Sequence, residues 1–121
     1  MSKYQNLDVW KTSMQLVKEV YLLTKKYPKE ELYALTSQTK RAGVSIPSNI
    51  AEGLGRNYKK DTIQFLHIAR RSIYELETLL NIAVMVEIIS EYDFKAILPS
   101  LEKSMQLLND FINYMEKSKL K

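Results

Sequence analysis

The chain has 121 residues, no cysteine and a formal net charge of +4 at pH 7. This length is that of one domain, residues 1–121, and the lack of cysteine excludes disulfides and thiolate metal sites. The first residues hold no apolar signal-peptide core, and the longest strongly apolar run, Ile82–Val86, is too short to span a membrane. We therefore expect a cytoplasmic protein with no membrane partner.

The first predicted helix begins near Leu7, with Asn6 or Asp8 as its N-cap, and ends at Tyr27-Pro28. The end is predicted because a residue that precedes proline is pushed out of the helical region. The apolar residues of this helix form two neighbouring stripes, which is more than one packing seam requires. We favour Trp10 as a core anchor, and the alternative is a contact between subunits.

The second predicted helix covers residues 35–56, with Thr36 as its cap, and is the most unusual segment of the chain. A polar stripe follows the edge of its apolar face, where side chains are partly desolvated and need partners. Pro47 either kinks this helix or begins a second helical segment. The polar stripe consists of Gln38, Arg41, Ser45, Asn49, Glu52 and Arg56.

The polar stripe has two interpretations. Arg41 and Glu52 lie about 16 Å apart along one helix, so each needs a partner from another element. We favour a structural network in which both meet Glu75 and other polar groups of the third helix or of a neighbouring subunit, with Glu75 as the partner of Arg41. The alternative is a groove for a ligand or a protein partner.

The last two predicted helices complete a bundle. The third covers about residues 59–89, a length of about 45 Å. Ser90 followed by Asp93 predicts a capping arrangement for the fourth helix, and Pro99 should bend or break its first turn. Apolar residues then recur in steps of four and three over residues 94–115, which is the spacing of a bundle seam. The pattern predicts an all-α, antiparallel up-down four-helix bundle.

Several motifs resemble one known family. They are LTSQ at 35–38, SIPSNIAEG at 45–53, FLHIAR at 65–70 and SIYELET at 72–78. Together they are similar to the bacterial four-helix-bundle proteins encoded in intervening sequences of 23S rRNA genes, which are related to the accessory variability determinant of diversity-generating retroelements. The resemblance covers nearly the whole chain. It implies assembly into a closed ring of five subunits, and a role beside a reverse transcriptase and its RNA.

The residues do not form a catalytic constellation. A di-iron site in a bundle needs two Glu-x-x-His motifs, whereas the single histidine, His67, follows Gln64 at that spacing. Glu75 and Glu77 are two positions apart on a helix, so their side chains point in different directions. We therefore expect no enzymatic activity, no metal and no cofactor.

The basic loop after the second helix favours nucleic acid as a partner. Lysines and arginines would neutralise phosphates, and Tyr58 would stack on an unpaired base. The alternative is that these cations are simply solvated. The candidate nucleic-acid contacts are Arg56, Tyr58, Lys59, Lys60, Arg70 and Arg71.

The functional prediction is a non-catalytic accessory protein that binds RNA or DNA. It would act as a homo-oligomer in a ribonucleoprotein or with a reverse transcriptase. The family resemblance favours a pentamer. Wide apolar faces on the first and last helices independently favour self-association. The alternative is a structural adaptor that joins proteins and has no nucleic-acid role.

Overall fold

The computed structural model describes residues 3–119 and 121, and these form four long α-helices and two short 3₁₀ turns, with no strand among them. The predicted all-α four-helix bundle is therefore confirmed. The 3₁₀ turns are Lys3–Asn6 and Lys29–Glu31. The helices are α1 (Asp8–Thr24), α2 (Leu35–Leu54), α3 (Lys59–Met85) and α4 (Glu91–Lys117).

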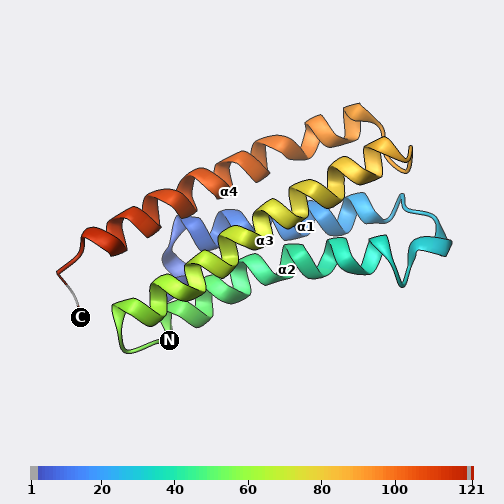
Figure 1. Ribbon diagram of the computed structural model, residues 1–121. Helices are drawn as coiled ribbons and strands as arrows, with labels where there is room; N and C mark the ends of the chain where they lie inside the picture. The colour runs from blue at the N-terminus through green and yellow to red at the C-terminus, as the bar shows by residue number, and fades with distance from the viewer. Residues whose placement is uncertain (1–2, 120) are drawn as a thin grey trace.

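Successive helices run in opposite directions, and each packs against two neighbours (Figure 1). The helix α1 contacts α2 and α4, and α3 contacts the same two helices from the other side. The connections are short because each helix begins at the same end of the bundle at which the previous helix ends. Both chain termini lie at the end of the bundle that carries the α2–α3 loop, and the other two connections lie at the opposite end (Figure 1).

The core lies along the bundle axis and is built mainly from branched aliphatic side chains. Three buried hydroxyl groups in this core have partners, because each donates to a carbonyl of its own helix: Ser13 to Trp10 at 2.7 Å, Thr39 to Leu35 at 2.7 Å and Ser72 to Ile68 at 3.1 Å. The fully buried large apolar residues are Leu16, Val20, Ile46, Ile50, Leu66, Ile73, Leu76, Leu80, Leu108 and Ile112.

The predicted caps of the first two helices are wrong. Leu7, not Asn6 or Asp8, occupies the N-cap of α1, and no side chain caps the helix. Ala34 occupies the N-cap of α2, and Thr36 lies inside the first turn. Apolar packing stabilises these helix starts instead, which is the usual source of helix stability in a folded protein.

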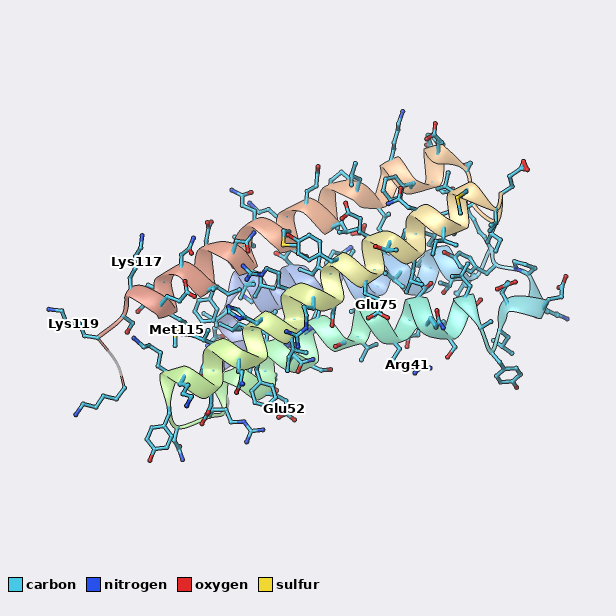
Figure 2. The ribbon with its side chains drawn as sticks, viewed as in Figure 1. Arg41, Glu52, Glu75, Met115, Lys117 and Lys119 are labelled. Atoms are coloured by element: carbon cyan, nitrogen blue, oxygen red, sulfur yellow. The ribbon has the colours of Figure 1, made fainter. Side chains whose placement is uncertain are left out.

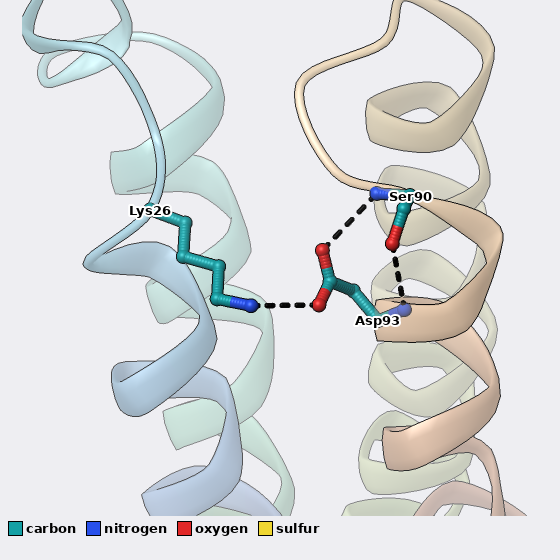
Figure 3. Close-up of polar contacts among 3 residues, drawn as sticks. All are labelled: Lys26, Ser90 and Asp93. Atoms are coloured by element: carbon teal, nitrogen blue, oxygen red, sulfur yellow. Dashed lines mark hydrogen bonds and ion pairs between the residues drawn. The ribbon is translucent and has the colours of Figure 1, made fainter.

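The capping arrangement predicted for α4 is confirmed. Ser90 Oγ accepts from Asp93 N at 3.0 Å, and Ser90 N donates to Asp93 Oδ2 at 3.1 Å. Lys26, just after α1, donates from Nζ to Asp93 Oδ1 at 2.7 Å, so one carboxylate joins the cap to the α1–α2 connection (Figure 3). The Lys26 hydrogen bond and the Ser90 backbone bond hold the pKa of Asp93 below its usual value.

Neither internal proline divides its helix. Pro47 is buried inside a continuous α2, and Pro99 is exposed inside a continuous α4. Each removes one backbone donor, a loss that neighbouring turns and tertiary packing tolerate. The third helix, in contrast, is shorter than predicted. It ends at Met85 because Glu87 adopts φ 65°, a left-handed conformation incompatible with a continuing helix.

Candidate nucleic-acid interface

A close crossing of α2 and α3 positions the basic loop. A Cβ atom added to Gly53 would lie 2.9 Å from Phe65 Cβ and 3.1 Å from the Thr62 carbonyl oxygen, so only glycine fits without a shift. Thr62 Oγ1 donates to the Gly53 carbonyl oxygen at 2.7 Å across the same crossing. The short loop over residues 55–58 is therefore held tightly at the end of the bundle.

The C-terminal tail lies against this loop. Lys59 Nζ donates to the Ser118 carbonyl oxygen at 2.8 Å, and Lys59 N donates to the Lys121 carbonyl oxygen at 3.0 Å. Lys117 and Lys119 project from the same end of the bundle (Figure 2). We call this cluster the basic end, and it consists of Arg56, Lys59, Lys60, Lys117, Lys119 and Lys121.

Some of the predicted contacts are already engaged within the protein. Arg56 Nη2 pairs with Glu52 Oε2 at 2.9 Å, and its guanidinium lies 4.6 Å from the centre of the Phe65 ring. Arg70 Nη1 donates to Asn109 Oδ1 of α4 at 3.0 Å, so this arginine joins two helices. Lys60 is exposed, and its charge is open to solvent.

The structure does not bring all the predicted contacts together. Arg70 and Arg71 lie about 16 Å along α3 from the basic end. Arg71 is exposed and shares one face of α3 with Lys60, because residues at steps of four and three follow one side of a helix. Arg71 can therefore extend the basic end along α3, whereas Arg70 already donates to Asn109.

Two features of this end were not identified in the sequence. The lysines of the tail were not predicted as nucleic-acid contacts, because a contact to Lys59 across the fold has no local signal in the sequence. Tyr114, which was not predicted either, is 63% exposed and stacks on Phe111 with ring centres 6.2 Å apart. Tyr58 is equally exposed in the loop, so the basic end carries two aromatic rings that can stack on bases.

The polar stripe forms a smaller network than predicted. Asn49 Nδ2 donates to the carbonyl oxygen of Ser45 at 2.8 Å and to Ser45 Oγ at 2.9 Å. Ser45 Oγ lies 2.8 Å from Ser72 Oγ of α3. Since Ser72 donates to Ile68, Ser45 donates to Ser72, and this chain of bonds joins α2 to α3. Ser72 belongs to this network but was not predicted from the sequence.

Within the described part of the single chain, the charged partners predicted for Arg41 and Glu52 on α3 are not present. Among the described residues, no ion pair joins Arg41 to Glu75, and both side chains are exposed. Arg41 Nη2 instead contacts Ser37 Oγ of its own helix at 3.3 Å. Glu52 does not need another element either, because it pairs with Arg56 one turn away. Arg41 and Glu75 line a recess of about 150 Å³ together with Gln38 and Ser45 (Figure 2).

His67 and the acidic side chains are the remaining candidates for site chemistry. His67 Nε2 lies 4.0 Å from Glu116 Oε2 of α4, and the exposed fractions of the two side chains are 38% and 50%. Across the described residues, no three histidine or carboxylate side chains gather as metal ligands would. Within the same residues, every helix is too short or too polar to cross a membrane.

Comparisons with known proteins agree with this architecture. A family model described as 23S rRNA-intervening sequence protein matches residues 5–110. A crystal structure of a protein with unknown function from the S23 ribosomal protein family of Bacteroides thetaiotaomicron is similar, with a TM-score of 0.78 and 25% sequence identity. The similarity covers 86% of this chain and 97% of that one. No curated protein matches the sequence.

Proposed function

Because the chain belongs to the family of 23S rRNA-intervening sequence proteins, we propose that it is a non-catalytic protein that binds RNA or DNA through its basic end. The observation that carries this proposal is the pair of bonds from Lys59 to the C-terminal tail, at 2.8 and 3.0 Å. These bonds hold the tail lysines beside the loop lysines. Six cationic side chains thus gather at this end, and the acidic side chains near them in the sequence are those of Glu52, Asp61 and Glu116.

The mechanism is neutralisation of phosphates with release of counterions. Lys60 and the tail lysines contact successive phosphates, and Arg71 extends the track along α3. Tyr58 and Tyr114 provide planar surfaces on which unpaired bases stack with little sequence preference. Single-stranded or looped nucleic acid is favoured, because a duplex does not expose the faces of its bases.

The test is a salt titration of binding to a fluorescent single-stranded RNA. The variant Lys60→Ala/Lys119→Ala removes two charges from the basic end, and the slope of log affinity against log salt should fall by about 1.4. The matched control, Lys95→Ala/Lys103→Ala, removes two exposed charges from α4 elsewhere and should leave the slope unchanged. No binding by the wild type, or equal effects of the two variants, would refute the proposal.

We also propose that the protein acts as a homo-oligomer in which a second copy covers an apolar recess between α1 and α2. The family resemblance favours a pentamer. This recess has a volume of about 310 Å³ and is lined by Trp10, Met14, Val44 and Pro47 among others. Met14 and Val44 are 43% and 40% exposed, so the face is apolar and open in the single chain. A contiguous apolar surface of this kind is typical of an interface.

A further inference from the structure

A third recess lies at the end of the bundle opposite the basic end. It has a volume of about 200 Å³ and is formed by the end of α1, the connection to α2 and the first turns of α2. Three lysines line it: Lys25, Lys29 and Lys40. We call it the lysine recess, and none of the residues analysed above as nucleic-acid contacts belongs to it.

The lysine recess is strongly positive. No carboxylate lines it, and none of its three lysines forms an ion pair within the described residues. Lys40 Nζ is held 4.8 Å from the centre of the Tyr21 ring, which orients its ammonium group. Glu31, in the connection that leads into α2, turns its carboxylate to the backbone N–H of Leu35 at 3.4 Å.

Two buried hydroxyl groups at this recess have no partner. Tyr27 and Thr36 both line it and are only 8% and 5% exposed, yet neither hydroxyl oxygen makes a hydrogen bond. Burial raises the pKa of Tyr27, and the Thr39 hydroxyl opposes the rise without forming a bond of acceptable geometry. In the single chain both hydroxyl oxygens are closed off from solvent, so a ligand in the recess reaches them only if the side chains move. Buried polar groups are nearly always paired, and a ligand would supply the missing partner.

The start of α2 adds further donors. Its N-cap is Ala34, whose side chain cannot accept a hydrogen bond, and the backbone N–H groups of Thr36 and Ser37 have no acceptor among the described residues. Free N–H groups and the helix dipole both favour an anion at this position. Three lysines and Thr36 thus lie at one recess, and the amide of Ser37 follows that of Thr36 in the same helical turn.

We propose that the lysine recess binds a phosphate monoester. A monoester carries close to two negative charges and three acceptor oxygens, which matches three lysines and several unused donors better than a singly charged diester does. The apolar wall, which includes Pro28 and Leu32, accommodates the group to which the phosphate is attached. The source is either a free nucleoside monophosphate or the terminal phosphate of an RNA strand. This site is independent of the basic end.

The experiment is a titration of isotope-labelled protein with AMP, followed by amide resonances. AMP should shift the amides of Thr36 and Ser37. The variant Lys29→Ala/Lys40→Ala should weaken binding at least about tenfold, and Thr36→Val, which keeps the side-chain shape, should weaken it roughly threefold to tenfold. The basic-end variant Lys60→Ala/Lys119→Ala serves as the matched control and should bind AMP like the wild type. Thermal melting confirms that each variant is folded.

Two RNA hexamers identify the source, both tested against the Lys60→Ala/Lys119→Ala variant to suppress binding at the basic end. If a 5′-phosphorylated hexamer shifts the recess amides and a 5′-hydroxyl hexamer does not, the recess holds a strand end. If AMP shifts the recess amides and the phosphorylated hexamer does not, the recess holds a free nucleotide. Failure of both phosphate monoesters to shift these amides, or equal weakening by the control variant, would overturn the proposal while leaving the proposed function untouched.

Discussion

Lys59 and Ser118 are 59 positions apart in the chain, yet Lys59 Nζ donates to the carbonyl oxygen of Ser118 at 2.8 Å. This bond joins the first residue of α3 to the residue that follows α4. It therefore determines whether the tail lysines act together with the loop, or as separate charges on a free tail.

The first prediction compares Lys59→Met with Lys60→Met. Both variants remove one charge and keep an aliphatic side chain, but only Lys59→Met removes the tether to the tail. Lys60→Met should lower the salt slope of RNA binding by about 0.7. Lys59→Met should lower it further, because it also removes the side-chain bond to Ser118, one of the two bonds that hold the tail lysines in place. Hydrogen exchange at residues 117–119 should rise in Lys59→Met alone, and equal slopes would show that the tail makes no contribution.

The second prediction concerns the close crossing of α2 and α3. Gly53→Ala places a methyl group 2.9 Å from Phe65 Cβ, so the helices must separate, and overpacking of this kind typically costs about 1–3 kcal/mol. Gly43→Ala is the matched control, because its methyl group would lie at least 3.7 Å from the nearest atoms of Val20. That change should stabilise the helix by about 0.5–1 kcal/mol. Urea unfolding of both variants measures the difference, and destabilisation of both would refute the packing argument.

The third prediction is a pH dependence. Hydrogen bonds from Lys26 and from the Ser90 backbone lower the pKa of Asp93 in the folded protein. A carboxyl group whose folded pKa is lowered stabilises the protein above its unfolded pKa, about 3.9, and the contribution disappears as the pH falls through the lower folded value. Asp93→Asn should therefore melt below the wild type at pH 7.

The difference in melting temperature between wild type and Asp93→Asn should shrink as the pH falls below about 4. Glu91→Gln is a suitable control because Glu91 is exposed in the same first turn but forms no ion pair with the described residues. A difference that is constant from pH 7 to pH 2.5 would show that Asp93 stabilises the protein through packing and not through its charge.

The fourth prediction follows from the corrected polar stripe. Arg41 is exposed, and its hydrogen bond within the described residues goes to Ser37 of its own helix, so Arg41→Ala should change the free energy of unfolding by no more than about 0.5 kcal/mol. Ser45 Oγ and Ser72 Oγ, in contrast, form a hydrogen bond of 2.8 Å that joins α2 to α3. A double-mutant cycle of Ser45→Ala and Ser72→Ala should give a coupling energy of about 1 kcal/mol. Additive single variants would mean that the bond has no net effect.

Elements with a strong local pattern were predictable from sequence. The heptad-like spacing of α4 and the Ser90–Asp93 cap depend only on residues near each other in the chain, and both are present. Contacts between distant residues were not predictable in the same way. The Lys59–Ser118 bond and the Ser45–Ser72 bond depend on the rotation of one helix against another. Arg41 and Glu75 line one recess, but both side chains are exposed to solvent and no ion pair joins them among the described residues.

The last prediction concerns assembly. The apolar recess between α1 and α2 is open in the single chain, and an interface with a second copy would bury it. If the copies form the five-membered ring that the family resemblance implies, light scattering at micromolar concentration should report about five times the 14.1 kDa of one chain. Met14→Glu places a charge on this face and should shift the protein toward monomers without unfolding it. Leu22→Glu is the matched control, because Leu22 is 53% exposed on the same helix but does not line the recess. A wild type that stays monomeric at every accessible concentration would refute self-association, and dissociation by both variants would place the interface elsewhere on α1.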